Sequence, residues 1–216
     1  MNVFIVYAHP SEDSFTRHVR DKFIEGLETA GHSYLLSDLY KMGFQTDISE
    51  AEYLREANYD LDAPLPEDVM AEQSKINSCE AIVFIYPVFW TEAPAKLVGW
   101  FDRVWTYGFA YAKRKHTSNQ VRGMKQLEKA LVICVAGEGL YFLKEYGHIE
   151  AMKTVMLGDR IFDRAKIKDF VVLDAMSKYA IEAREVNWDR NLKTAFEAGR
   201  NFWYQRSIYD VGVNEE

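Results

Sequence analysis

The sequence has few cysteines, no long hydrophobic run and no excess of basic residues. The two cysteines of the 216 residues, Cys79 and Cys134, lie far apart and beside apolar residues, so we expect buried free thiols rather than a disulfide framework. No stretch approaches the roughly 18 apolar residues of a membrane-spanning helix, which predicts a protein that is not inserted in a membrane. The formal net charge of −7 argues against a nucleic-acid-binding protein.

Several catalytic signatures are also absent. The chain has no GxGxxG or GxxxxGK[ST] loop, which disfavours the classical dinucleotide fingerprint and the P-loop. It has no GxSxG elbow, which disfavours a serine hydrolase, and its five histidines show no HExxH or clustered spacing, so no metal site is expected. The first residues enter a strand-like run directly, which predicts no signal peptide and a cytoplasmic location.

Short apolar runs rich in β-branched residues are present, with helical patterns between them. They occupy residues 3–7, 81–86, 130–135 and 170–173, with a weaker one over 33–39. Because the stronger runs are continuous rather than alternating, we expect strands that are covered by helices on both faces. The intervening patterns predict helices over 15–30, 67–77, from Pro94 to 105 and over 188–206. Residues 42–66 and 112–123 read as irregular, and the whole chain, 1–216, as one α/β domain with a parallel sheet.

Ligands of open parallel sheets bind beyond the carboxyl ends of the strands, so the loops there are the first candidates. The loop after the first strand has a histidine and hydroxyl residues before a helix, where free amides favour an anion: His9, Ser14, Phe15 and Thr16. Ser14 either only caps the helix or also helps to bind a phosphate.

The loops after the third and fourth strands have the composition of a flat, apolar wall. Aromatic residues, a proline and close-approaching glycines would pack against a planar heterocycle and hydrogen-bond its edge. The residues are Pro87, Val88, Phe89, Trp90 and Thr91 in the first loop, and Ala136, Gly137, Gly139 and Tyr141 in the second.

Aromatic residues make up 14% of the chain, and six of them fall between Trp100 and Tyr111. So many aromatic side chains are difficult to bury in the core of one chain. The cluster therefore predicts contact with a flat ligand or with a partner subunit.

Five motifs in this order and spacing resemble the flavodoxin-like NAD(P)H:quinone oxidoreductases, the DT-diaphorase family, over about residues 1–175. They are Tyr7-Ala8-His9-Pro10 through Ser14-Phe15, Ala71-Glu72-Gln73, Tyr86-Pro87-Val88-Phe89-Trp90, Gly99-Trp100-Phe101-Asp102-Arg103-Val104 and Gly108-Phe109-Ala110-Tyr111. The resemblance implies a flavodoxin-like three-layer fold with a five-stranded parallel sheet in the order 2-1-3-4-5.

The resemblance also implies a function. The chain would be a flavin-dependent NAD(P)H dehydrogenase that reduces quinones by a ping-pong mechanism, with FAD (alternatively FMN) and with NADH or NADPH as co-substrate. It would be a homodimer with its active site at the interface. Tyr141 and His148 would be catalytic at the flavin edge, and Gln73 would lie near the flavin. Trp90, Tyr107, Phe109 and Tyr111 would line the substrate pocket.

This sequence departs from the family pattern at three places. Cys134-Val135-Ala136-Gly137 replaces a Thr-Thr-Gly-Gly, His148 is one residue further from Tyr141 than the pattern expects, and Lys113 replaces a tyrosine. The basic run 113–116 is either a solvated surface or a contact for a dinucleotide phosphate. Two other functions stay open: a flavodoxin-type electron carrier, and an ancillary regulatory subunit of a membrane transporter.

Overall fold

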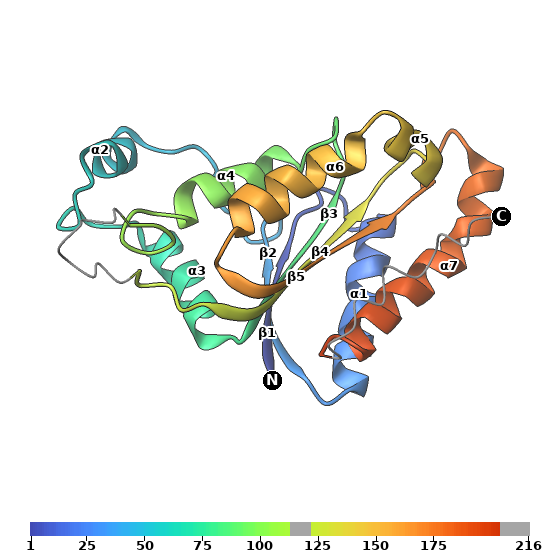
Figure 1. Cartoon of the computed structure of the whole chain (residues 1–216), viewed down its shortest axis with the longest axis horizontal. Helices are drawn as coiled ribbons and strands as arrows, with labels where there is room; N and C mark the ends of the chain where they lie inside the picture. Colours follow the sequence, from blue (N-terminus) through green and yellow to red (C-terminus); the bar gives the residue numbers. More distant parts are fainter. Residues whose placement is uncertain (113–121, 204–216) are drawn as a thin grey trace.

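The computed structural model describes residues 1–112 and 122–203 and contains one five-stranded sheet (Figure 1). The spatial order of the strands is β2 (Ser33–Asp38), β1 (Asn2–Tyr7), β3 (Ala81–Pro87), β4 (Leu127–Val135) and β5 (Ala165–Leu173). Every neighbouring pair is parallel. The predicted order 2-1-3-4-5 is therefore confirmed, and the direction of winding reverses between β1 and β3.

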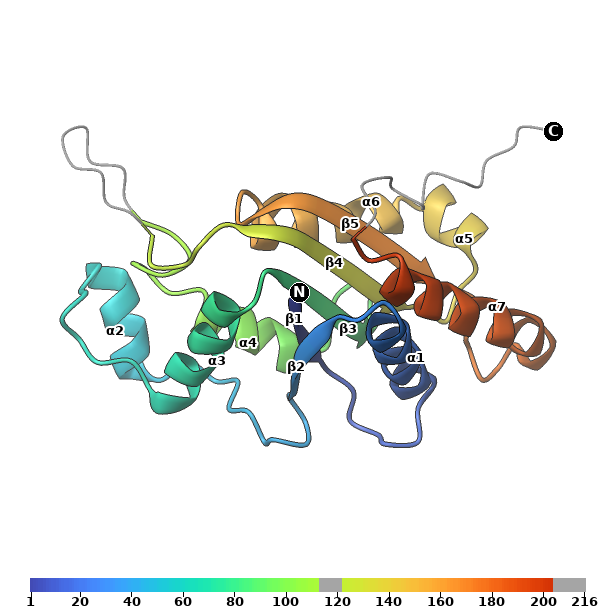
Figure 2. The same ribbon diagram turned by 90° about the horizontal axis from the view of Figure 1, so that it is seen from below.

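Helices cover both faces of the sheet. In Figures 1 and 2, α1 (Phe15–Thr29) and α7 (Ile181–Arg200) lie side by side on one face. The other face carries α3 (Glu67–Ser78), α4 (Ala95–Val104), α6 (His148–Lys153) and the π-helical segment η1 (Thr154–Ile161). The short α5 (Leu140–Glu145) follows β4, and α2 (Glu50–Asn58) lies at one end of the molecule.

The continuous apolar runs supply two cores at once. Along β1, Val3 and Ile5 pack with α1 and α7, while Phe4 and Val6 pack with α3 and α4. Successive side chains of a strand point to opposite faces, so a strand between two helical layers needs an apolar residue at every position.

Two glycines let α1 and α7 approach each other closely. A Cβ atom on Gly26 would lie 2.1 Å from the backbone oxygen of Phe196, and one on Gly199 would lie 2.1 Å from that of Phe23. Since α1 follows β1 and α7 follows β5, this packing brings the amino ends of both helices to the same edge of the sheet.

Three sequence predictions about helices need correction. The segment 42–66, expected to be irregular, contains α2, which begins with a capping box between Ser49 and Glu52. It covers no sheet face, and its larger apolar side chains, Tyr53 and Leu54, stay exposed. The last helix begins at Ile181 rather than at 188 and ends at Arg200. The end of its predicted range, like the basic run 113–116, lies outside the described residues.

The aromatic cluster was expected to need a ligand or a partner, and this expectation is wrong for most of it. Trp100 is 0% exposed between α4 and the sheet, and its Nε1 donates a hydrogen bond to Glu72 at 2.9 Å. Phe101, Tyr107 and Phe109 are buried as well, whereas Tyr111 stays partly exposed. A single chain therefore buries most of these rings between α3, α4 and the sheet.

The two cysteines are buried and free, as predicted. Within the part of the chain that the structure describes, no helix has the length and apolar character to cross a membrane, and no group of three side chains could hold a metal ion.

Candidate functional site

A cavity of about 350 Å³, the strand-end cavity, lies where β1, β3 and β4 end. Nine of the residues predicted to bind the cofactor line it: His9, Ser14, Phe15, Thr16, Pro87, Val88, Phe89, Ala136 and Gly137. The winding reverses between β1 and β3, which is where open α/β sheets bind ligands. Three loops far apart in the sequence thus meet as expected.

The amino end of α1 forms one wall of the cavity. Ser14 is the N-cap, and its hydroxyl accepts a hydrogen bond from the Arg17 N–H at 3.1 Å. Phe15 and Thr16 carry the first N–H groups of the helix, which have no intrahelical acceptor. Ser14 therefore does cap the helix, and the neighbouring amides still face a site that suits an anion.

His9 is held beside this helix end. Its Nδ1 accepts a hydrogen bond from the Ser11 N–H at 2.9 Å. Burial lowers the pKa of His9, and the nearby charge of Lys178 lowers it further. The neutral imidazole is favoured, which leaves the positive charge of the cavity to other groups.

Lys178 and Arg184, which the sequence analysis missed, bring that positive charge. Lys178 comes from the segment between β5 and α7, and Arg184 from the first turn of α7; the carboxyl end of β5 lies at the same sheet edge. The Arg184 guanidinium lies 4.7 Å from the centre of the Trp188 ring, and its Nε is buried with no hydrogen-bond partner. Among the described residues of the lining, Asp13 is the one carboxylate, so Lys178 and Arg184 outnumber it.

A tight turn follows β3 beside the cavity. Phe89 and Glu92 exchange backbone hydrogen bonds of 2.9 and 3.0 Å, and the two residues between them, Trp90 and Thr91, both have positive φ. Trp90 is 99% exposed, so it is not a core residue. It lies next to the residues of the lining without being one of them.

The loops after β4 and β5 are joined by backbone hydrogen bonds. The Ser177 N–H donates to Gly137 at 3.2 Å, and the Ala175 N–H donates to Glu138 at 2.9 Å. Gly139 precedes α5, on which Tyr141 is 82% exposed. Gly139 and Tyr141 do not line the cavity, and their proposed contact with a cofactor stays a prediction.

His148, the other predicted catalytic residue, begins α6. Its Nδ1 lies 3.1 Å from the Thr91 hydroxyl oxygen. The structure therefore brings His148, at the start of α6, to the turn after β3.

Three further predicted residues line a different cavity of about 270 Å³, the tyrosine cavity: Gln73, Tyr107 and Phe109. Gln73 Nε2 donates to the Val104 carbonyl and to the Thr106 hydroxyl, both at 3.0 Å. Nearby, the Tyr111 hydroxyl donates to Glu56 at 2.7 Å. Within one chain, Gln73, Tyr107 and Phe109 line a cavity that does not include Trp90. The resemblance implies a pocket at the interface of two subunits, so the assignment of these residues to it stays a prediction.

Comparison with known proteins agrees with this architecture. A family described as having a flavodoxin-like fold matches residues 1–193. The chain belongs to this flavodoxin-like family. A solved NAD(P)H:quinone oxidoreductase from Methanothermobacter marburgensis is 43% identical, with a TM-score of 0.85 over 95% of this chain and 98% of that one.

Curated relatives have related names. NAD(P)H dehydrogenase (quinone) 1 of Rattus norvegicus is 28% identical over 96% of this chain and 82% of its own length. A ribosyldihydronicotinamide dehydrogenase-like protein, traD, of Penicillium crustosum is 32% identical over 56% of this chain. In that comparison the matched part spans 49% of the fungal protein's own length.

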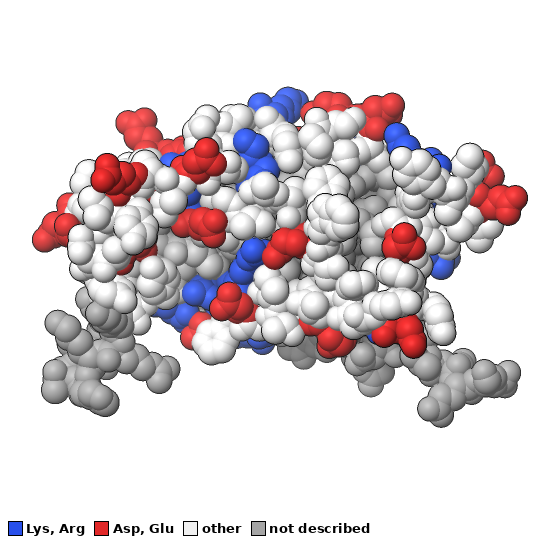
Figure 3. All heavy atoms as spheres, turned by 90° about the horizontal axis from the view of Figure 1, so that it is seen from above, with Lys and Arg blue, Asp and Glu red and all other residues white. Residues whose placement is uncertain are grey.

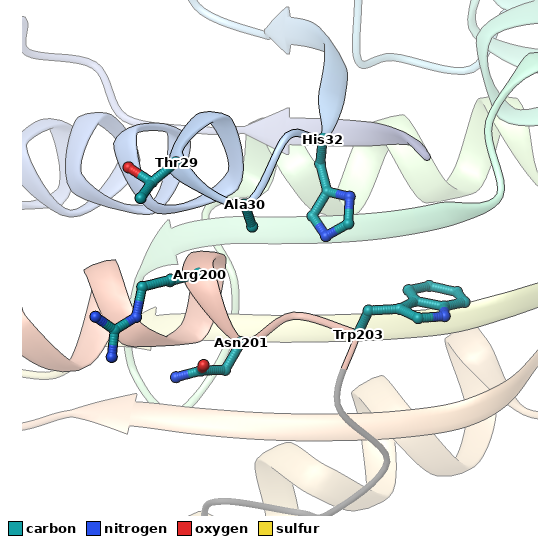
Figure 4. A pocket seen from close by; sticks show the side chains of 6 residues that line it. All are labelled: Thr29, Ala30, His32, Arg200, Asn201 and Trp203. Carbon is teal, nitrogen blue, oxygen red and sulfur yellow. The ribbon is translucent and has the colours of Figure 1, made fainter.

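A larger cavity of about 610 Å³ shares no lining residue with the strand-end cavity (Figure 4). Thr29, Ala30 and His32 line it from the end of α1 and the approach to β2, and Arg200, Asn201 and Trp203 line it from the end of α7. It thus lies at the amino ends of the strands, the edge that open parallel sheets do not use for ligands.

The face shown in Figure 3 has acidic and basic side chains interspersed among uncharged ones. No continuous basic surface crosses the described part of this face. Nothing on it resembles the electrostatic footprint of a nucleic-acid-binding protein.

Proposed function

We propose that the chain is an NAD(P)H:quinone oxidoreductase that holds a flavin in the strand-end cavity. The observation that carries the proposal is the meeting of three elements there: a capped helix end with free amides, the Pro87–Phe89 segment after β3, and the Ala136–Gly137 segment after β4. The first suits a phosphate and the other two suit a planar ring. The names of the rat and Methanothermobacter marburgensis proteins support the activity.

A bound flavin would supply the redox chemistry, taking a hydride from NAD(P)H and passing two electrons to a quinone in a ping-pong sequence. The protein would orient the ring and exclude water from one of its faces. The exposed side chains of Trp90 and Tyr141 could then contact the ring edge or the second substrate. The described strands form one sheet, and α2, which covers no sheet face, is tied to the rest by Arg55 and Glu52; this supports a single flavin-binding domain.

We favour FAD over FMN because the cavity has two kinds of anion-binding group. The helix end at Ser14 can take one phosphate, and Lys178 with Arg184 can take a second. The partnerless Nε of Arg184 supports this, because a buried N–H without an acceptor is costly and a second phosphate would supply one.

We further propose a homodimer whose active site is completed by the partner. The tyrosine cavity, with Gln73, Tyr107 and Phe109, is separate from the strand-end cavity of the same chain, so it would have to face the flavin of a second copy. The exposed aromatic side chains of Trp90, Tyr141 and Tyr146 suit an interface that covers the flavin. Sedimentation at micromolar concentration tests this, and an active, flavin-loaded monomer would refute it.

The function is tested by steady-state oxidation of NADH and of NADPH with a quinone as acceptor. We expect turnover only with the flavin bound and parallel-line kinetics when both substrates are varied. A protein that binds flavin but oxidises neither nucleotide would instead be an electron carrier. A protein that binds no flavin would favour an ancillary subunit.

The preference for FAD is tested by Lys178→Gln and Arg184→Gln, with Lys193→Gln as the control, since Lys193 is an exposed cation of α7 that does not line the cavity. Loss of one charge-assisted contact should raise the Kd of FAD about tenfold in each variant and change the Kd of FMN far less. Equal weakening of both flavins would show that the cations bind the phosphate that FAD and FMN share.

A further inference from the structure

The turn after β3 has a backbone that its sequence does not favour. Trp90 has a φ of 54° and Thr91 a φ of 66°, and the flanking Phe89 and Glu92 form an antiparallel bridge. Positive φ at both central residues is the geometry of a type I′ turn, which normally takes asparagine, aspartate or glycine there. A β-branched threonine in the left-handed region is strained, so contacts from elsewhere have to hold it.

Two side chains, one from α6 and one from η1, contact this turn. His148 Nδ1 lies 3.1 Å from Thr91 Oγ1, and Arg160 Nη1 of η1 lies 2.9 Å from the Glu92 carboxylate. The same Glu92 oxygen accepts a hydrogen bond from the Ala93 N–H at 2.7 Å. The Arg160 contact holds the exit of the turn, whereas the His148 contact holds the strained residue itself.

The ring of His148 is itself oriented by its neighbours. It stacks on Tyr146 at 6.2 Å and 20°, and it packs beside Phe142 at 5.8 Å and 33°. Gly147, with a φ of 71°, precedes it and turns the chain into α6. Two rings and a turn thus fix the direction in which Nδ1 points, which is toward Thr91.

We propose that His148 is a positioning residue: it holds Thr91 in the left-handed region and so fixes the turn that presents Trp90 at the mouth of the strand-end cavity. The hold on Thr91 follows from the geometry alone, while its effect on flavin binding rests on the proposed function. His148 then acts through Thr91 and not on the reacting atoms. Glycine at position 91 adopts positive φ without strain, so it would remove the need for His148.

A double-mutant cycle tests the proposal. His148→Phe keeps the ring stacking and removes Nδ1, while Thr91→Val keeps the β-branch and removes the hydroxyl. Each variant should raise the Kd of FAD about fivefold, the effect of one lost hydrogen bond, and lower the urea midpoint of unfolding. The double variant should be no worse than either single variant, because both remove the same contact.

Two matched variants complete the cycle. Thr91→Ser keeps the hydroxyl and should bind FAD as the wild type does. In a Thr91→Gly background, His148→Phe should change neither the Kd of FAD nor the urea midpoint, because glycine is unstrained at positive φ and has no hydroxyl for Nδ1 to contact.

Three results would overturn the proposal. One is a loss of kcat in His148→Phe with no change in Thr91→Val, which would place His148 at the reacting atoms. The second is a double variant in which the two single effects multiply. The third is an undiminished effect of His148→Phe in the glycine background. If the wild type binds no flavin, the proposed function fails, and the urea midpoints still decide whether His148 holds Thr91.

Discussion

Gly199→Ala should destabilise the protein because it forces α1 and α7 apart. The new Cβ would lie 2.1 Å from the Phe23 oxygen and 2.9 Å from the Leu27 nitrogen, so backbone atoms, which cannot rotate away, block it. Ordinary contact needs about 1 Å more, and a gap of that size weakens the packing of every residue between the helices. Overpacking of this kind costs about 3 kcal/mol, and the better helix propensity of alanine returns about 1 kcal/mol. The free energy of unfolding should fall by about 2 kcal/mol.

Gly158→Ala is the control, because a Cβ there would meet nothing within 4 Å and only the propensity gain remains. Thermal unfolding followed by circular dichroism should lower the Tm of Gly199→Ala by roughly 4–8 °C and leave that of Gly158→Ala unchanged or higher. The same substitution should weaken flavin binding, since Ser14, which caps α1, and Arg184, in the first turn of α7, both line the cavity. A Gly199→Ala protein as stable as the control would refute the packing argument.

Three other perturbations test the site and its surroundings. Ser14→Asp should lower flavin occupancy in the purified protein, because it places a negative charge against the phosphate; unchanged occupancy would remove this loop from the site. Trp90→Ala should weaken flavin binding or turnover while the Tm stays near that of the wild type, since the side chain is fully exposed; a large loss of Tm would contradict this. Burial raises the pKa of four tyrosines above the ordinary value of 10.0, namely Tyr7, Tyr40, Tyr86 and Tyr111. The unfolded chain therefore ionises first, so the free energy of unfolding should fall as the pH rises above about 10, and equal urea midpoints at pH 8 and 10.5 would count against it.

The sheet could be predicted because most of its strands are marked by a continuous run of apolar residues, and this pattern recurs along the chain. The apolar run 81–86 has no polar interruption, and all of β3 is buried between two helical layers. The helix α2 could not be predicted in the same way. It covers no sheet face, and its hold on the molecule comes from Arg55, which donates to the Tyr107 carbonyl, and from Glu52, which pairs with Arg103. Such polar contacts join residues far apart in the sequence and leave no periodic trace in it.

The site residues that the sequence predicted also lie in local patterns, whereas those that it did not predict come together only in the folded chain. His9, Ser14 and Thr16 were identified because one short loop contains the whole pattern of an anion site. Lys178 and Arg184 lie at different spacings after β5, and only the sheet order brings them to the same edge. Because all five parallel strands end at the same edge, the residues that follow the fifth strand are also candidates for the site, and this rule could have identified Lys178 and Arg184.

The turn at Trp90 and Thr91 shows why a site residue can conflict with every rule that predicts stability. The hydrophobic effect opposes a tryptophan that is 99% exposed, and backbone sterics oppose positive φ at both residues. Neither Trp90 nor Thr91 belongs to either hydrophobic core, so neither feature is explained by core packing. Within the chain, the contacts of His148 and Arg160 hold the turn, but they leave the Trp90 side chain exposed. The flavin that we propose for the neighbouring strand-end cavity would contact that side chain, and Trp90→Ala tests this contact.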